Sequence, residues 1–273
     1  MKKIAVTGGK GGVGKSTMAV LLSNEEVRKG KKVILCDCDI ECPNDYLLLN
    51  QKLENEKDKV YFEFPKLIKS KCQKCGLCAK TCRNNAIFQA PGKYPIFLKE
   101  LCSACGACQA VCPYGAIVPE KEEAAKLFLN KVKENYFLVT GLVRTGIEEG
   151  GPVVTKTKKF ALELAEKIKA DFIFFDTAPG IHCSVISALK DCDKAICVAE
   201  PSPMSRIDLK LIMELCKKME IPTEIILNQA DLSDSSGIEK LASSFNSEII
   251  KRVNYSSKLV EAYSKGKLLD FKI

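Results

Sequence analysis

The 273-residue sequence predicts an α/β fold with a mainly parallel sheet flanked by helices, interrupted by a small cysteine-rich insertion. Short apolar segments alternate with helix-like segments on both sides of the insertion, and a glycine-rich turn follows the first apolar segment. The alternation stops after Asp39, and a duplicated cysteine pattern comes next. We therefore expect a main domain at residues 1–64 and 119–273 and an inserted domain at residues 65–118.

The first elements of the main domain are predicted from apolar runs and a glycine stop. Lys3–Thr7 is expected to be a buried strand, followed by a helix from about Lys15 to Gly30, where glycine favours a C-terminal cap. Lys32–Asp37 is the second expected strand. Residues 43–65 are polar and irregular, so no regular element is expected there.

Beyond the insertion the alternation resumes. Residues 120–145 leave two alternatives open, because Lys121–Glu134 has a helical composition, whereas Leu127–Leu129 and Tyr136–Val143 suit a hairpin. The elements predicted after them are the helix Thr157–Lys169, the apolar strand Phe172–Phe175, the strand Ala195–Ala199, the helix Ser205–Met219, the strand Glu224–Leu227, and helices near Gly237–Phe245 and Ser256–Lys265.

The composition indicates a globular, cytoplasmic, metal-binding protein. Hydrophobic residues make up 46% and charged residues 28% of the chain, which is ordinary for a globular protein. No apolar run reaches the roughly 18–20 residues of a membrane span, and the chain enters its first strand without a signal-peptide segment. Disulfides are therefore not expected, and the 15 cysteines, an odd number, favour metal binding.

A phosphate-binding motif occupies the turn after the first strand. Gly8–Thr17 reads GGKGGVGKST and fits G-x4-G-K-[ST]. Glycines let successive backbone N–H groups face a phosphate, while Lys15 would neutralise the β- and γ-phosphates and Ser16 would offer its hydroxyl to Mg²⁺. A glycine turn that binds nothing is the alternative, and the complete spacing between a strand and a helix argues against it. The nucleotide-binding residues expected here are Gly9, Gly11, Gly12, Val13, Gly14, Lys15, Ser16 and Thr17.

Lys10 gives this loop the form KGGVGKST. In this form the loop resembles the deviant Walker A motif of the MinD/ParA ATPases and of their relative, the nitrogenase iron protein. The resemblance implies a P-loop NTPase fold, slow ATP hydrolysis, and a homodimer, or a heterodimer with a related ATPase, that encloses ATP between two subunits. It also implies that Lys10 stabilises transition-state charge on the partner's ATP, so that Lys10 and Lys15 are both catalytic.

Further segments match the same family. Asp39 follows the second strand, where these ATPases carry an aspartate that orients the attacking water. Asp176–Gly180 reads DTAPG and resembles the family's switch, in which Asp176 would hold Mg²⁺ through water. A carboxylate at a strand end could be a turn cap instead, but three motifs in family order favour the functional role. Asn228 lies where the family reads the adenine edge, and Asn254 departs from the family by replacing a usual proline.

Two cysteine runs carry the spacing C-x2-C-x2-C-x3-C, CQKCGLCAKTC at residues 72–82 and CSACGACQAVC at residues 102–112. This spacing resembles that of small bacterial-type ferredoxins, which hold two 4Fe–4S clusters in a small α+β domain and share the fourth cysteine of each run with the other cluster. A zinc ribbon, the alternative, needs only two C-x2-C pairs. The resemblance assigns Cys72, Cys75, Cys78 and Cys112 to cluster 1, and Cys102, Cys105, Cys108 and Cys82 to cluster 2.

The remaining cysteines fall outside these runs. Cys183 lies seven residues after Asp176, near the position of a cluster ligand in the nitrogenase iron protein, but residues 140–175 offer no second cysteine. A bridging cluster is therefore incomplete, and a buried apolar role for Cys183 is the alternative. The cysteines expected to pack in the core are Cys36, Cys38, Cys192, Cys197 and Cys216.

The net charge of +8 raises the question of nucleic-acid binding. Two clusters would lower it to about +4, and the lysines are spread along the sequence, so no nucleic-acid partner is expected. No membrane partner is expected either, because the segment Lys265–Ile273 offers only modest apolar area. The favoured function is ATP-gated electron transfer to a redox partner. The alternatives are a scaffold or carrier that supplies a metallocofactor to an acceptor protein, and a spatial-positioning ATPase.

Overall fold

The computed structural model describes residues 1–146 and 150–272 and divides into two compact units. Unit 1 consists of Met1–Lys57, Leu127–Leu142 and Gly151–Ile273, and unit 2 consists of Asp58–Lys126 and Val143–Gly150. Each unit has a hydrophobic cluster of its own.

Unit 1 is built on a parallel sheet. The full strand order is β11-β10-β9-β1-β8-β2-β7-β6-β3, and every adjacent pair from β11 to β7 is parallel. The carboxyl ends of these strands therefore share one edge, where loops of α/β proteins form sites. The parallel strands are β1 (Lys2–Thr7), β2 (Val33–Asp37), β7 (Tyr136–Val143), β8 (Phe172–Asp176), β9 (Lys194–Ala199), β10 (Thr223–Asn228) and β11 (Glu248–Val253).

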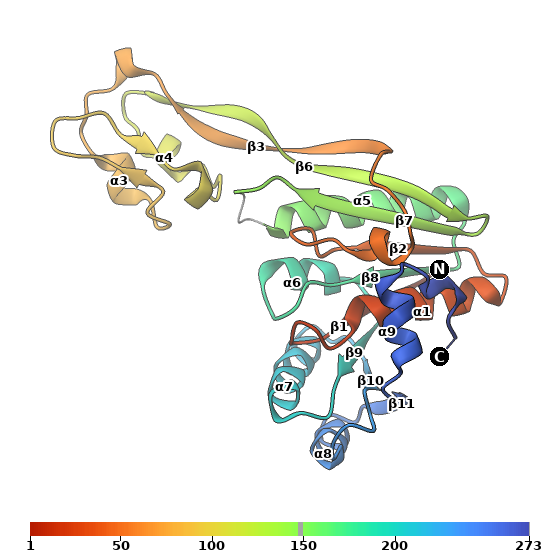
Figure 1. The fold of residues 1–273 in the computed structure, drawn as a ribbon. Helices are drawn as coiled ribbons and strands as arrows, with labels where there is room; N and C mark the ends of the chain where they lie inside the picture. The colour runs from red at the N-terminus through yellow and green to blue at the C-terminus, as the bar shows by residue number, and fades with distance from the viewer. Residues whose placement is uncertain (147–149, 273) are drawn as a thin grey trace. The chain divides into compact units, whose positions relative to one another are not determined.

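Helices cover both faces of this sheet (Figure 1). The central strand β2 is buried along its whole length, which explains its continuous apolar run. On one face Met18 and Leu21 of α1 pack in a cluster with Leu35 of β2 and Phe174 of β8. The helices of unit 1 are α1 (Lys15–Arg28), α2 (Asp45–Leu48), α5 (Gly150–Ile168), α6 (Cys183–Leu189), α7 (Pro203–Lys218), α8 (Ser236–Ser244) and α9 (Ser257–Ser264), and a 3-10 turn follows at Leu268–Asp270. Among the described residues, none of the helices combines the length and apolarity needed to cross a membrane.

A buried lysine joins α5 to the end of α6. Nζ of Lys158 donates a hydrogen bond to the carbonyl oxygen of Ala188 at 2.7 Å and another to that of Lys190. The same ammonium lies 4.5 Å from the centroid of the Phe175 ring. A cation at this place complements the negative C-terminal end of α6.

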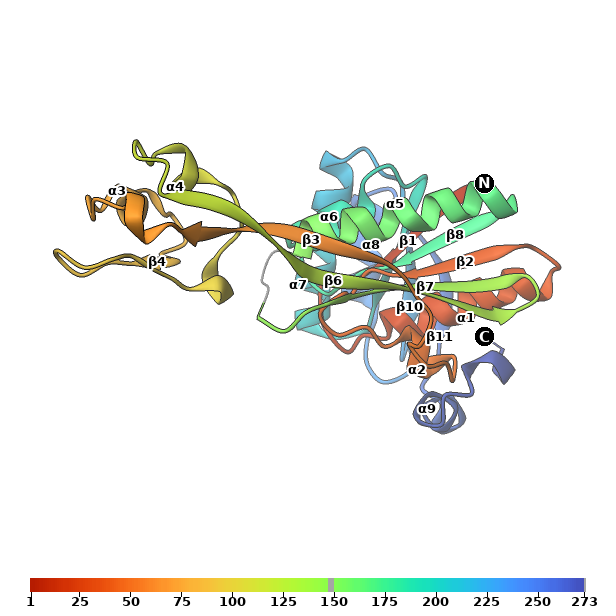
Figure 2. The ribbon, with the colours of Figure 1, turned by 90° about the horizontal axis from the view of Figure 1, so that it is seen from above.

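Unit 2 contains two similar halves between the strands β3 (Glu56–Leu67) and β6 (Ile117–Lys133). In Figure 2, α3, α4 and β4 gather at one end of these paired strands. The halves meet in a small core of Cys78, Ile87, Cys108 and Ile117. The first half contains a 3-10 turn at Lys69–Lys71, α3 (Leu77–Thr81) and β4 (Ile87–Phe88), and the second contains β5 (Ile96–Phe97), a 3-10 turn at Lys99–Leu101 and α4 (Ala107–Ala110).

The expectation of an irregular segment at residues 43–65 is wrong. It contains α2 and most of β3, which pairs with β6. Cross-strand ion pairs replace apolar alternation on this ribbon: Nζ of Lys59 lies 2.5 Å from Oε2 of Glu123, and Lys66 pairs with Glu120. The helix expected as one alternative at Lys121–Glu134 is also wrong, because these residues continue β6 and turn into β7.

The other predicted elements are present with shifted ends. The helix predicted at Thr157–Lys169 begins earlier, at Gly150, where Gly-Gly-Pro fits a first turn because proline has no N–H to leave unpaired. Besides α2 and the 3-10 turn at Leu268–Asp270, two further elements of unit 1 were not predicted, α6 and β11. β11 alternates between exposed and half-buried residues at the sheet edge, so it has no apolar run to mark it.

Candidate functional site

The glycine-rich loop lies between β1 and α1, at the carboxyl edge of the sheet. A Cβ atom on Gly9 would lie 2.3 Å from a backbone oxygen of α7, so only glycine fits there. Gly14 has a φ of +95°, and its Cβ would lie 2.6 Å from Nδ2 of Asn228. A Cβ on Gly11 or Gly12 would meet nothing within 4 Å, so this side of the loop is open to a ligand.

Two lysines of the loop have different partners. Lys15 is 7% exposed, and its Nζ donates to the carbonyl oxygen of Lys10 at 3.0 Å. Burial lowers the pKa of Lys15, and the carboxylates of Asp176 and Asp39 act against that shift. The ammonium of Lys10 instead lies 2.8 Å from Oε1 of Glu200 in the same chain. The structure thus brings Lys15, Asp39 and Asp176 together, while Lys10 forms a surface ion pair beside them.

Two carboxylates to which the sequence assigned no role, Asp37 and Asp45, lie beside Asp176. Asp37, Asp45 and Asp176 are buried, and one oxygen of each lies within 4.8 Å of the others. Asp37 organises this arrangement, because its Oδ1 accepts the N–H of Asp39 at 3.1 Å and its Oδ2 accepts those of Asn44 and Asp45 at 3.0 and 3.1 Å. No local pattern marks Asp45, which lies in the segment expected to be irregular.

Burial raises the pKa of all three carboxyls, and neighbouring carboxylates raise it further. The pKa values of Asp37 and Asp45 lie well above their usual range, because burial and then Asp176 oppose their ionisation. Burial raises the pKa of Asp176 to about 7. The oxygens of Asp45 and Asp176 find no hydrogen-bond partner in the described part of the chain. Unpartnered buried carboxylates near a phosphate-binding loop suit Mg²⁺, a hard cation that prefers oxygen ligands.

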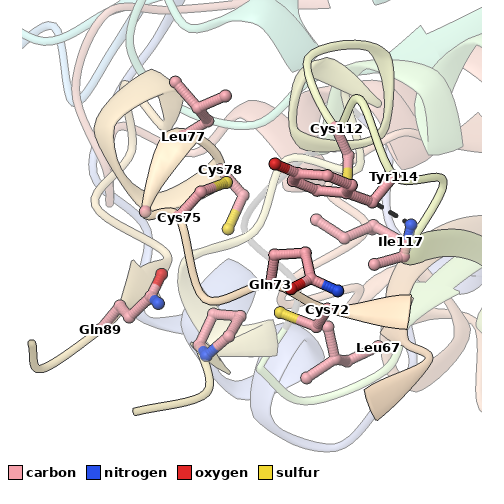
Figure 3. Close-up of a pocket in the computed structure, with 13 residues that line it drawn as sticks. Leu67, Cys72, Gln73, Cys75, Leu77, Cys78, Gln89, Cys112, Tyr114 and Ile117 are labelled. Atoms are coloured by element: carbon pink, nitrogen blue, oxygen red, sulfur yellow. Dashed lines mark hydrogen bonds between the residues drawn. The ribbon is translucent and has the colours of Figure 1, made fainter. Parts of the chain in front are cut away.

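In unit 2 the eight cysteines of the two runs separate into two cavities. The first is lined by Cys72, Cys75 and Cys78 from the first half and by Cys112 from the second. Figure 3 shows these side chains around one cavity. The second cavity is lined by Cys102, Cys105, Cys108 and, from the first half, Cys82. Each cavity thus draws its fourth cysteine from the other half.

Backbone N–H groups point at several of these sulfurs. In both halves the residue before the second cysteine of the run has a left-handed backbone conformation: φ is 58° at Lys74 and 52° at Ala104. N–H groups in such loops stabilise the thiolate form that a metal requires. The donors are Lys74 to Cys72 at 3.4 Å, Ala86 to Cys82 at 3.3 Å and Ala116 to Cys112 at 3.4 Å.

The distances between the cysteine sulfurs distinguish a zinc site from a site for a larger iron–sulfur cluster. A tetrahedral zinc site with Zn–S bonds of about 2.3 Å would bring its sulfurs within about 3.8 Å of one another. Among the described residues, the three aspartates form the only group of three or more ligand atoms within 4.8 Å. A 4Fe–4S cube bonds each cysteine to a different iron and holds the sulfurs apart, so the cavities fit a cube better than zinc. Burial raises the pKa of Cys108 to about 11, so its ionisation calls for a bound metal.

Comparison with known proteins settles the family. The protein-family model described as the CobQ/CobB/MinD/ParA nucleotide binding domain matches residues 4–269 of this chain. The chain belongs to this family. An uncharacterized protein of Methanocaldococcus jannaschii is 33% identical over 97% of this chain and 90% of its own length.

More distant relatives of this MinD/ParA-type chain carry functional names. A protein of Pyrococcus horikoshii named "iron-sulfur cluster carrier protein" is 25% identical, over 97% of this chain and 77% of its own. The structure of the MinD cell division protein of Aquifex aeolicus has a TM-score of 0.57 at 21% identity, covering 98% of this chain and 89% of that one. This likeness confirms the predicted P-loop α/β fold with a mainly parallel sheet.

Asn228 lies against the glycine-rich loop of this MinD/ParA-type chain. Its Nδ2 donates to the carbonyl oxygen of Val13 at 2.9 Å, so in this state the amide holds the loop. Contact between Asn228 and the adenine stays a prediction. Asp231 accepts the N–H of Tyr255 at 2.6 Å and so holds the loop that contains Asn254.

The other cysteines agree with most of their expected roles. Sγ of Cys36 lies 3.7 Å from Sγ of Cys38, and both are buried. Cys192, Cys197 and Cys216 are buried too, as expected of core residues. Cys183 is exposed at the start of α6, so a buried apolar role is wrong.

The aspartate group predicts how stability depends on pH. The pKa of Asp176 is raised from an ordinary 3.8 to about 7 in the folded state. The stability gained from the neutral form is complete below about pH 4 and is lost as the pH rises through about 7. In the absence of nucleotide and Mg²⁺, the melting temperature should therefore fall between about pH 4 and about pH 7, by about 2–4 °C for each 1 kcal/mol lost.

Asp45→Asn should flatten this pH dependence and raise the melting temperature at about pH 8, because it removes one of three repelling carboxylates. Asp234→Asn, at an exposed carboxyl whose pKa is lowered by Ser236, is the control and should leave the slope unchanged. Anaerobic differential scanning fluorimetry measures both. Equal slopes for the wild type and Asp45→Asn would contradict the assignment.

Proposed function

We propose that this chain binds and slowly hydrolyses ATP, and that the nucleotide state gates electron transfer from two 4Fe–4S clusters to a partner protein. One observation carries the proposal: the chain that forms a family-type nucleotide loop also forms two cavities, each lined by four cysteines. A protein that only positions cargo has no need of these eight ligands.

In the nucleotide half of the proposal, the loop N–H groups and Lys15 hold the phosphates and Ser16 ligates Mg²⁺. Asp176 supports the ion through water, and Asp39 orients the attacking water. Lys10 leaves Glu200 and reaches the phosphates of the ATP bound to the second subunit of a dimer. The pair of Lys10 with Glu200 is exposed at 41% and 17%, and surface pairs are worth about 0–1 kcal/mol, so its loss costs little.

In the cluster half, Cys72, Cys75, Cys78 and Cys112 hold cluster 1. The second set, Cys102, Cys105, Cys108 and Cys82, holds cluster 2. When bound, each cluster supplies a one-electron carrier. The N–H groups that donate to Cys72, Cys82 and Cys112 favour thiolate charge and tune the site.

A short stretch of chain links the two halves of the proposal. After Asp39 the chain forms α2, which contributes Asp45 to the buried carboxylates, and then enters β3. Mg²⁺ or ATP at the carboxylates would therefore act on residues that lead directly into unit 2. Nucleotide binding can affect the clusters by this route only if the segment has two conformations and the nucleotide binds one of them more tightly.

A redox titration of the reconstituted protein tests the proposal. We expect Mg-ATP to shift the potential of at least one cluster by about 60 mV, a tenfold change in a one-electron equilibrium. EPR under anaerobic conditions measures the potentials and counts the spins. Lys15→Ala should keep both clusters and lose the shift. Two intact clusters with equal potentials in both nucleotide states would count against gating.

The second candidate function is cluster assembly. It is favoured by the 25% identity, over 97% of this chain, to a protein named as an iron–sulfur cluster carrier. Transfer of ⁵⁵Fe-labelled clusters to an apo-ferredoxin, faster with ATP, would support it. The crossed ligand sets favour retention, because a departing cluster must leave cysteines of both halves. Retained label with ATP present would exclude this role.

A further inference from the structure

The net positive charge of the chain is concentrated in one segment of unit 2, residues 65–118. Residues 65–118 contain eight Lys and Arg residues against one carboxylate, Glu100, a net of +7 in a chain whose total is +8. The basic residues are as evenly spread as expected, and the net charge of this segment is high because it holds one of the 34 carboxylates of the chain. With two clusters of about −2 each, this segment still keeps about +3.

Four of these cations lie on the chain segments that line the first cavity, within a few residues of its lining residues, and we call them the Lys69 group: Lys69, Lys71, Lys74 and Lys93. Nζ of Lys74 and of Lys69 lie 4.6 and 5.9 Å from the centroid of the Tyr94 ring. Nε2 of Gln89 donates to the carbonyl oxygens of Lys74 at 3.1 Å and Lys93 at 2.8 Å, which ties the two loops together.

The Lys69 group is free of acidic partners. All four lysines are exposed, and no carboxylate in the described part of the chain pairs with them. By contrast, Lys66 and Lys99 of the same unit pair with Glu120 and Glu122. The group therefore offers a patch of uncompensated charge.

Apolar side chains and a cluster ligand lie next to the patch. Phe88 and Ile96 are opposite each other on β4 and β5 and are 61% and 58% exposed. Their chain neighbours Gln89 and Pro95 line the first cavity, together with the exposed Cys75. An apolar centre with a charged rim is the usual anatomy of a protein interface.

We propose that the Lys69 group and the Phe88–Ile96 pair form the docking surface for an acidic one-electron carrier protein, which exchanges electrons with cluster 1. This inference rests on the proposed presence of the clusters, and it requires no gating by ATP. A ring of acidic residues on the partner would meet the lysines, and its redox centre would come close to Cys75. One electron passes from reduced cluster 1 to the oxidised carrier, and no proton or bond changes hands.

The surface fits a protein better than a nucleic acid. Nucleic-acid sites place several aromatic rings along a basic groove so that bases can stack. Here a single ring, that of Tyr94, has two lysine ammonium groups near its centroid, and the exposed Phe88 and Ile96 lie side by side on a two-stranded sheet. Electrostatic attraction to an acidic face would steer encounter and weaken with salt.

Plastocyanin and cytochrome c provide opposite probes, since both are small high-potential electron acceptors, the first acidic and the second basic. Binding of ¹⁵N-labelled reduced plastocyanin to the oxidised protein is followed by NMR shifts without nucleotide. We expect binding at about 20 mM ionic strength that weakens at least tenfold at about 300 mM, and no comparable binding of cytochrome c. Stopped-flow oxidation of the reduced protein should follow the same order.

Two variants locate the surface. Substituting all four lysines of the Lys69 group with glutamine should weaken plastocyanin binding at least tenfold, with unchanged iron content. The matched control carries the same change at four exposed lysines of unit 1 and should bind like the wild type: Lys167, Lys217, Lys218 and Lys258.

The outcomes separate the hypotheses. Equal loss in both variants, or preferred binding of cytochrome c, would overturn the docking surface even if ATP shifts the cluster potentials. Tight binding of a single-stranded RNA that depends on the Lys69 group, without plastocyanin binding, would mark a nucleic-acid surface and overturn the proposal. A protein that holds no iron would overturn both this inference and the proposed function.

Discussion

Lys10→Ala is expected to lower the turnover number for ATP hydrolysis about 10³-fold while ATP binding changes little. A cation supplied by a second subunit to phosphoryl transfer is worth about 10³–10⁵ in rate, because it stabilises charge that develops only in the transition state. In the present state Nζ of Lys10 contacts Glu200, not its own loop, so its removal leaves the phosphate cradle intact. Phosphate release and equilibrium binding of a fluorescent ATP analogue measure the two effects.

Mixing two inactive chains tests whether Lys10 acts on the partner. A dimer of a Lys10→Ala chain and an Asp39→Ala chain contains one complete site, made of Asp39 from the first and Lys10 from the second. Random pairing of equal amounts makes half of the dimers mixed, each with one complete site of two, so the mixture should recover about a quarter of the wild-type rate. Lys31→Ala, at an exposed lysine of the same unit, is the control. No recovery in the mixture would place Lys10 in its own subunit's site.

The crossed sharing of cysteines makes the second large prediction. A chain with Cys102, Cys105 and Cys108 replaced by alanine should keep cluster 1, with about four iron and four sulfide per chain. Adding Cys82→Ala should not change that content. Adding Cys112→Ala should remove the remaining cluster, because Cys112 lines the first cavity.

The mirror background, with Cys72, Cys75 and Cys78 replaced, should show the reverse order. Iron and acid-labile sulfide analysis after anaerobic reconstitution measures both series, and EPR confirms the cluster type. If the chain that lacks Cys102, Cys105 and Cys108 lost its remaining cluster on the further change Cys82→Ala, each half would hold its own cluster. The two series together also control for damage to the small core of unit 2.

Sequence reasoning succeeded where geometry is local. The spacing of Gly9 to Thr17 determines the turn between β1 and α1, and the x2 spacings curl each cysteine run around a cavity. The parallel sheet followed from apolar strands such as β8, because a strand covered on both faces must be apolar throughout. The roles of these residues toward ATP and iron stay predictions.

What sequence reasoning missed depends on contacts between distant residues. Asp45 joins the buried carboxylates only because Asp37 binds the backbone of its loop. The pair of Lys10 and Glu200 joins positions 190 residues apart. The strand β3 is stabilised by charges on β6, so its polar sequence has no helical or alternating period to detect.

Lys158 sets where the helix after the DTAPG segment can move. Its buried ammonium donates hydrogen bonds to the carbonyl groups at the C-terminal end of α6. Moving that end away would leave a buried cation without hydrogen-bond acceptors. The other end begins at exposed residues, Ile181 to Cys183, directly after the segment that would sense the nucleotide. A nucleotide-driven change should therefore pivot α6 about its fixed C-terminal end, so that the largest displacement falls on Cys183 and its neighbours.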